Sequence, residues 1–233
     1  MYSKISNILN DINTVLVPRL CFGCNALLYR GEEHVCTVCR NQLPLTEYTF
    51  NAVNPVDRIF YGRINIIKAS SFLFFTEKGI VKSIIHYLKY KNQEQIGTFL
   101  GNWYGHILKE NNFLNNIDYV MPVPLHRKKL KTRGYNQVSL FAKSIAEHIG
   151  AQYKEGVLIK TANTKTQTKK SRILRWQNKQ ALYVLTDYEI FKDKNVLLLD
   201  DVITTGATME VCATALSATK GINIYVASMA IVP

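Results

Sequence analysis

One stretch of the sequence indicates the fold more clearly than any other: Val196-Leu197-Leu198-Leu199-Asp200-Asp201-Val202-Ile203-Thr204-Thr205-Gly206-Ala207-Thr208. Its four consecutive apolar residues, 196–199, are typical of a strand buried on both faces, as the strands of parallel sheets are. A helical pattern follows at 207–218. The polar residues between them therefore lie where open α/β sheets place their ligands, at the carboxyl end of a strand.

These polar residues suit a sugar phosphate. Residues 204–208 offer hydroxyl groups and the unpaired N–H groups of a helix start, which together with the helix dipole favour an anion. Gly206 lets the backbone approach that anion closely. Asp200 and Asp201 are acceptors suited to a sugar diol, or to Mg²⁺ directly or through water. The simpler alternative is that the two aspartates only cap the helix.

The whole run resembles the PRPP-binding signature of type I phosphoribosyltransferases. In that family two acidic residues hold the ribose hydroxyls and the loop holds the 5-phosphate. By resemblance, these PRPP-binding roles fall on Asp200, Asp201, Thr204, Thr205, Gly206, Ala207 and Thr208.

Composition narrows the class of protein. With 233 residues, 47% of them hydrophobic, the chain can bury one good-sized core plus a small appendage, and general disorder is excluded. No apolar run reaches the ~18 residues that span a bilayer, and the N-terminus lacks the pattern of a signal peptide. We therefore expect a cytoplasmic protein. The 29 Lys plus Arg against 17 Asp plus Glu, a net charge of +12, indicate polyanionic partners such as nucleic acid or pyrophosphate.

Four cysteines, Cys21, Cys24, Cys36 and Cys39, form two C-x-x-C pairs. Paired knuckles at this spacing can close a tetrahedral thiolate site around Zn²⁺, and four thiolates with no open position indicate a structural metal. Disulfides are the main alternative, but the cytosol keeps thiols reduced. A redox C-x-x-C is less favoured, because neither pair follows a strand of a βαβ unit.

Two further observations concern the same end of the chain. Apolar residues at helical spacing predict an amphipathic helix at 3–16, which we expect to dock on the protein rather than on a membrane. His34 is either a substitute metal ligand or a solvent-facing side chain, and the fifth cysteine, Cys212, is interpreted as a small buried residue.

The rest of the chain alternates strands and helices. Residues 46–66 carry few periodic signals and two breakers, so we expect a linker there. Alternation of strands and helices implies a mainly parallel sheet with right-handed crossovers. We expect strands at 67–75, 118–123, 157–160, 195–199 and 222–232, and helices at 78–90, 93–109, 137–149 and 207–218.

Two basic segments complete the pattern. Residues 122–137 include Arg127, Lys128 and Arg133, which suit pyrophosphate, although such a run is often a solvated surface loop. The second basic segment covers residues 161–178, and its first part, 161–170, is polar enough to be mobile, as a hood over a site must be. Trp176 in that segment could stack on a base or anchor a short helix.

Taken in order, the two C-x-x-C pairs, His86-Tyr-Leu-Lys-Tyr90, Pro122-Val-Pro-Leu125, Arg133-Gly-Tyr-Asn-Gln137, Thr166-Gln167, Arg175-x-x-Asn178 and the 196–208 run resemble the ComF family of competence-associated, phosphoribosyltransferase-like proteins. The resemblance covers nearly the whole chain. The sequence departs from the family pattern at Leu182, where the family tends to have an aromatic residue, and at Val138, where it often has a small one. Both differences affect packing more than chemistry.

The resemblance implies an α/β, type I phosphoribosyltransferase fold over 67–233, a zinc module with its helix over 1–45 and a linker over 46–66. It implies PRPP and Mg²⁺ as ligands, with Asp200, Asp201 and Arg133 as catalytic residues and Arg127, Lys128 and Arg133 as pyrophosphate-binding residues. The role implied is DNA uptake or DNA utilisation in the cytoplasm or at the inner face of the membrane. The partners implied are single-stranded DNA and DNA-uptake helicase or channel proteins. The alternative is an active phosphoribosyltransferase of nucleotide metabolism or salvage with no DNA role.

Overall fold

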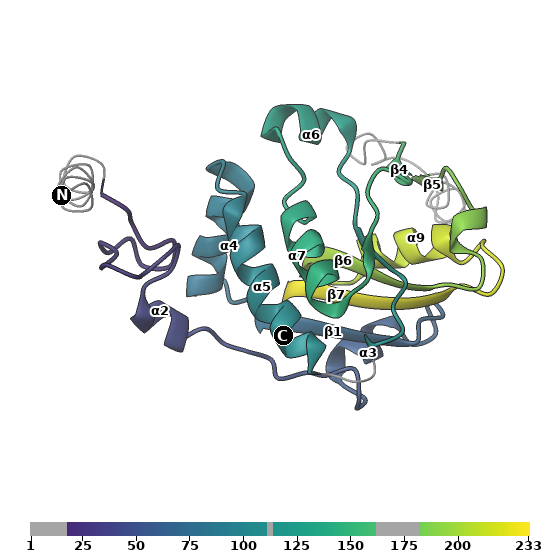
Figure 1. The fold of residues 1–233 in the computed structure, drawn as a ribbon, viewed down its shortest axis with the longest axis horizontal. Helices are drawn as coiled ribbons and strands as arrows, with labels where there is room; N and C mark the ends of the chain where they lie inside the picture. The colour runs from purple at the N-terminus through teal and green to yellow at the C-terminus, as the bar shows by residue number, and fades with distance from the viewer. Residues whose placement is uncertain (1–17, 111–113, 162–181) are drawn as a thin grey trace, which may run out of the picture.

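A five-stranded parallel sheet forms the centre of the molecule (Figure 1). The computed structural model describes residues 18–110, 114–161 and 182–233. The strand order is β1-β7-β6-β2-β3, and all four pairings are parallel. The strands are β1 Lys68–Phe74, β2 Tyr119–Pro122, β3 Gln152–Tyr153, β6 Asn195–Ile203 and β7 Asn223–Ile231, and a separate antiparallel hairpin pairs β4 Leu158–Lys160 with β5 Tyr183–Leu185.

The expected parallel sheet and each expected strand and helix within the described residues are confirmed, within a few residues at their ends. The expected helix at 3–16 and the expected hood with Trp176 lie outside the described residues. The described helices are α2 Thr37–Asn41, α3 Pro55–Phe60, α4 Ile80–Tyr90, α5 Gln95–Lys109, α6 Arg127–Arg133, α7 Ser139–Ile149 and α9 Ala207–Leu216, with a 3₁₀ turn at Glu189–Phe191.

Both faces of the sheet are covered, as the apolar run of β6 predicted. Side chains of a strand alternate between faces, and Leu197 and Leu199 lie in one core with α4, α5 and α7. Val196 and Leu198 lie in a second core with α3, α9 and the β4–β5 hairpin. A strand buried on both sides tolerates few polar residues, so the two aspartates that follow in the same strand need a specific reason to be there.

α5 and α7 approach each other closely because glycines line their contact. A side-chain carbon on Gly101 would lie 2.7 Å from the backbone oxygen of Phe141, and one on Gly105 would lie 2.8 Å from the ring of His148. Gly97 makes a third, looser contact of 3.2 Å with the backbone nitrogen of Phe141. This pair of helices covers the sheet next to β2, the strand that leads into α6.

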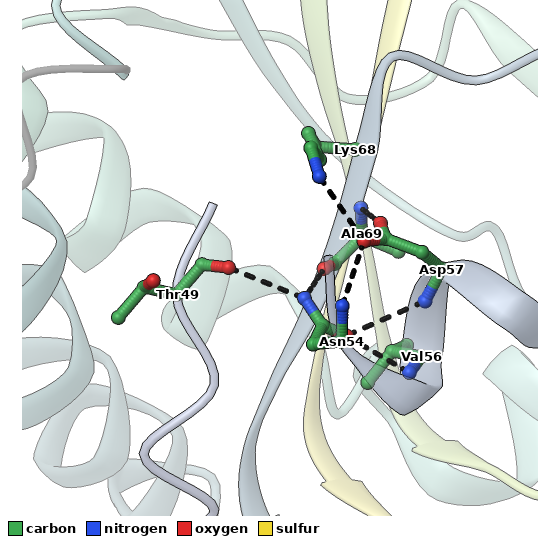
Figure 2. A network of polar contacts seen from close by, with 6 residues as sticks. All are labelled: Thr49, Asn54, Val56, Asp57, Lys68 and Ala69. Carbon is green, nitrogen blue, oxygen red and sulfur yellow. Dashed lines mark hydrogen bonds and ion pairs between the residues drawn. The ribbon is translucent and has the colours of Figure 1, made fainter. Parts of the chain in front are cut away.

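The segment expected to be a linker, 46–66, contains helix α3. Asn54 and Asp57 form a capping box, and Pro55 occupies the first turn. Figure 2 shows how the same two side chains also bind β1: Asn54 Nδ2 donates to the oxygen of Ala69 (2.8 Å), and Asp57 Oδ1 accepts from its N–H (2.7 Å). Phe60 is fully buried, so α3 packs on the sheet. A six-residue helix has too few turns to show periodicity, and the cap was its one signal. The domain boundaries themselves stay a prediction.

Residues 18–45, the Cys module, pack against α4, which Figure 1 shows between the module and the sheet. A side-chain carbon on Gly23 would lie 2.8 Å from Ile80 Cγ2 and 2.9 Å from Cys39 Sγ. Cys21, Cys36 and Cys39 belong to the same buried cluster as α4 and α5. Among the described helices, none combines the length and the apolar character needed to cross a membrane.

Candidate phosphoribosyl site

The two adjacent aspartates lie within β6 rather than after it. The strand continues through Asp200, which pairs in register with Ser228, as far as Ile203, which pairs with Ile231. The sequence predicted that the strand ends at Leu199. Because consecutive strand residues point to opposite faces, the two carboxylates leave β6 on different sides. Each therefore has its own set of partners.

Asp201 faces α4 and α7 and is 7% exposed. Its Oδ1 pairs with Lys89 Nζ at 2.9 Å, and its Oδ2 accepts from Gln137 Nε2. Gln137 in turn accepts from the guanidinium of Arg133. Two of the motifs that carry the family resemblance, at 86–90 and at 133–137, thus meet at one carboxylate.

Asp200 faces the β4–β5 hairpin and α9, where its charge acts on Tyr183 and Cys212. Burial and the neighbouring charge of Asp201 raise the pKa of Asp200 to about 7, against the lowering effect of Lys89 and Lys160. Lys160 lies over the ring of Tyr183 at 4.9 Å, and its own pKa is lowered, first by burial. The β4–β5 hairpin therefore places the cation of Lys160 near Asp200, a contribution that the sequence did not predict.

The loop that follows the acid pair is open to solvent and tightly seated at its base. Thr204, Thr205 and Thr208 are exposed. Gly206 has a φ of +70° and is the N-cap residue of α9, a conformation that favours glycine. A side-chain carbon there would also lie 2.8 Å from Ile59 and from Phe60. The predicted turn and its glycine lie at the start of a ten-residue helix. The unpaired N–H groups of a helix start favour an anion.

Arg63 holds this loop from outside, and no local sequence signal pointed to it. Its NH1 donates to the backbone oxygen of Thr205 (2.6 Å) and to that of Ile59 (3.0 Å). Its guanidinium also pairs with Glu210 in the first turn of α9. The guanidinium fork can bond several oxygens in one plane, so a single side chain links α3, the loop and α9.

The basic segment after β2 forms helix α6 instead of the expected loop. His126 caps its start by accepting from the N–H of Lys128 (3.2 Å), and Gly134 ends it with a φ of +85°. Lysine, arginine and leucine are good helix formers, so a cap at each end suffices to form the short helix.

A pocket of about 460 Å³ separates α6 from the end of α4. Its wall combines the exposed ring of Tyr90, with Arg133 over it at 5.6 Å, and several ammonium groups. Lys128 and Arg133 line this pocket, whereas Arg127 is exposed and is not among its lining residues. The lining residues are Lys89, Tyr90, Asn92, Lys128, Lys129, Thr132 and Arg133.

The four cysteines of the Cys module form one cluster, with their sulfur atoms within 4.8 Å of one another. Cys24 Sγ and Cys36 Sγ are 3.8 Å apart, which matches the separation of about 3.8 Å that two corners of a Zn–S tetrahedron with bonds near 2.3 Å would have. Backbone N–H groups of Cys36 and Gly23 point at the sulfur of Cys21 (3.2 and 3.3 Å). His34 stacks on Phe22 and is not part of the cluster. The donor set fits a metal ion.

The environment of the cluster lowers the pKa of Cys21, whereas burial and the neighbouring thiols raise the pKa of Cys39. Burial raises the pKa of the Cys21 thiol, but backbone N–H groups of Cys36, Cys24 and Gly23 outweigh burial and lower it to about 7. A thiol whose thiolate is accessible near neutral pH is a ready metal ligand.

Comparison with known proteins agrees with this geometry. The model of the phosphoribosyl transferase domain matches residues 139–228, which include α7, β6 and α9. Competence protein F of Haemophilus influenzae is 24% identical over 205 residues, covering 81% of this chain and 86% of that protein. Competence protein ComFC of Bacillus subtilis is 23% identical over 204 residues, covering 85% and 78%.

The DNA utilization protein YhgH of Escherichia coli is 27% identical over 209 residues, covering 83% of this chain and 88% of that protein. The resemblance to the ComF family is therefore confirmed over most of the chain. The parallel sheet with flanking helices and the domain match likewise confirm the phosphoribosyltransferase-type fold, preceded by a cysteine cluster.

Proposed function

We propose that this protein binds Mg²⁺ with PRPP at the end of β6 and acts in DNA uptake or DNA utilisation. The observation that carries the proposal is the acid pair within β6, followed by a solvent-exposed threonine loop whose glycine starts α9. Three proteins that are similar to it over most of their length are named for competence and for DNA utilization, which supports the biological role.

In this proposal each part of the site has one task. The hydroxyls and N–H groups of residues 204–208 bind the 5-phosphate, and the carboxylates of Asp200 and Asp201 accept from the ribose hydroxyls. Mg²⁺ neutralises charge on the pyrophosphate when it is bound. Lys128 and Arg133 bind the pyrophosphate from the α6 side, and Arg127 extends the positive surface.

The same geometry suits phosphoribosyl transfer. The bond between the anomeric carbon and the pyrophosphate oxygen would break, and a lone pair of the acceptor would form the new bond as pyrophosphate leaves. Asp200 and Asp201 would stabilise the positive charge that develops on the ribose, and Arg133 the negative charge that develops on the leaving group. Release of pyrophosphate, assayed over a panel of amine and nucleobase acceptors, tests this step. Failure of every acceptor would leave a binding site without transfer.

Contact with single-stranded DNA is the second part of the proposal. The exposed ring of Tyr90 and the cations of α6 line one pocket, and ring stacking with phosphate contacts is how proteins bind single strands. If the pocket binds DNA, the logarithm of affinity for a thymidine oligonucleotide should fall with the logarithm of salt by roughly 0.7 per neutralised phosphate. A flat plot would favour the alternative, a phosphoribosyltransferase of nucleotide metabolism or salvage with no DNA role.

We further propose that the four-cysteine cluster binds structural Zn²⁺. Four thiolates leave no position for a reacting water, and three of the four cysteines, Cys21, Cys36 and Cys39, lie in the main hydrophobic core. The metal would therefore hold the Cys module on α4 and take no part in transfer.

A further inference from the structure

We propose that α4 couples the Cys module to the phosphoribosyl site. Lys89, which faces the phosphoribosyl site, binds the pyrophosphate. Tyr87, which contacts the Cys module, positions Lys89. This inference rests on the proposed function, because the ligand concerned is the pyrophosphate of PRPP. It adds to that function a residue of the 86–90 motif that binds ligand and a task for the Cys module.

Lys89 lies between the acid pair, Asp200 and Asp201, and the basic pocket, as we call the pocket between α6 and the end of α4. Its Nζ pairs with Asp201 Oδ1 at 2.9 Å, and the same side chain lines the pocket with Lys128 and Arg133. A lysine ammonium has three donors that rotate freely. Lys89 can therefore keep one bond to Asp201 and donate another to a pyrophosphate oxygen in the pocket. In the free protein it neutralises the buried carboxylate.

The last turn of α4 also holds the 133–137 motif. The backbone oxygen of Leu88 accepts from the hydroxyl of Tyr135, and Arg133 lies over the ring of Tyr90 at 5.6 Å. Both neighbours of Lys89 in the sequence are thus in contact with the segment that supplies Arg133, Leu88 through a hydrogen bond and Tyr90 through its ring. A displacement of this turn would move Lys89 and Arg133 together.

The other side of the same turn is attached to the Cys module. The hydroxyl of Tyr87 donates to Asn25 Oδ1 at 2.7 Å, and its ring lies 4.9 Å from that of Phe22. Phe22 lies within the first C-x-x-C pair, and Asn25 follows it directly. The first turn of α4 is fixed as well, since Ile80 packs on Gly23. Tyr87 and Lys89 are two residues apart on one eleven-residue helix, so the cysteine knuckle and the acid pair are connected through a single rigid element.

A double-mutant cycle tests whether Tyr87 acts through Lys89. The probe is pyrophosphate with Mg²⁺, titrated calorimetrically into the parent, Lys89→Met, Tyr87→Ala and the double variant. We expect Lys89→Met and Tyr87→Ala each to weaken binding about tenfold, or roughly 1.4 kcal/mol. In the Lys89→Met background, Tyr87→Ala should cost clearly less than in the parent, because only its effect through Arg133 remains. Losses that add, or a Lys89→Met variant that binds as the parent does, would overturn the proposal.

Matched variants separate positioning from damage to the fold. Tyr87→Phe keeps the ring contact with Phe22 and loses the hydrogen bond to Asn25. It should therefore fold normally and show a smaller loss, which should be reduced further in the Lys89→Met background. Lys82→Met removes an exposed lysine from the same helix and should leave pyrophosphate affinity unchanged. A loss with Lys82→Met equal to that with Lys89→Met would reduce the effect to net charge and contradict the assignment.

Hydrogen exchange in the absence of ligand tests the coupling even if the proposed function is wrong. In Tyr87→Phe, and in the parent after metal chelation, amides of the last turn of α4 and of residues 133–137 should exchange faster, while those of α9 stay unchanged. Unchanged exchange at 133–137 would refute the coupling. A parent protein that binds neither pyrophosphate nor PRPP would instead refute the proposed function, and the exchange result would still decide the coupling.

Discussion

A side-chain carbon on Gly206 would lie 2.8 Å from Cε1 of Phe60. The loop that starts α9 therefore rests directly on α3, a helix from the segment expected to be a linker. The proposed phosphate loop is shaped from below by an element that lies almost 150 residues earlier in the chain. Its conformation depends on this packing as much as on its own threonines and glycine.

Replacing Gly206 with alanine tests that packing, and Gly62 offers a matched control. Both glycines have a φ of +70°, but no atom lies within 4 Å of a side-chain carbon built on Gly62. Gly62→Ala should lose only the cost of the left-handed conformation, about 1 kcal/mol. Gly206→Ala should lose more and should also weaken PRPP binding. Equal melting temperatures for the two variants would show that α3 does not constrain the loop.

Arg63 should matter for ligand binding more than for stability. It bonds the backbone oxygen of Thr205 in the loop itself, but it is partly exposed, so its removal should cost only about 1 kcal/mol of stability. Arg63→Met should weaken binding of Mg²⁺ with PRPP several-fold, because the loop loses its outer support. Arg58→Met, which removes an exposed arginine of α3, is the control. If both variants bind as the parent does, the contacts of Arg63 with the loop have no role in binding.

The raised pKa of Asp200 predicts a pH-dependent penalty in stability. An aspartate in the unfolded chain titrates near 3.9, whereas burial and Asp201 raise the pKa of Asp200 to about 7 in the folded protein. The folded state therefore binds more protons than the unfolded state between these two values, and stability falls as pH rises through this window.

Asp200→Asn removes that titration. Near pH 4 the melting temperature of this variant should equal that of the parent or lie below it. Between pH 4 and 7 it should rise relative to the parent, and above pH 7 the difference should stay constant. Each kcal/mol of difference in the free energy of unfolding should change the melting temperature by about 2–4 °C. Melting curves of both proteins at pH 4, 5, 6, 7 and 8 measure the difference. A gain that does not vary with pH would mean that Asp200 titrates normally.

Much of the site was predictable from sequence because its signals are local. The apolar run of β6 and the glycine at the start of α9 each express one element's own geometry, and both were found where the sequence placed them. Arg63 could not be found this way, since its bond to Thr205 joins residues 142 positions apart. The opposite directions of Asp200 and Asp201 were missed because the strand continues past Leu199, and pairing with β7 determines that continuation.

Removal of metal should loosen the main core, because three of the four cysteines are buried within it. We expect one zinc per chain by elemental analysis, and chelation should lower the melting temperature. Cys39→Ser should lose most of the metal. Cys212→Ala lies outside the cluster and should retain it. A full complement of metal in Cys39→Ser would contradict a four-cysteine site.

The most direct test of the central claim is a calorimetric titration of Mg²⁺ with PRPP into the parent protein and into the Asp200→Asn/Asp201→Asn variant. We expect a single site per chain in the parent and a loss of affinity of at least about 100-fold in the variant, or roughly 2.7 kcal/mol. Melting curves should show that both proteins are folded. Equal binding by the two proteins would remove the acid pair of β6 from the ligand site and contradict the account.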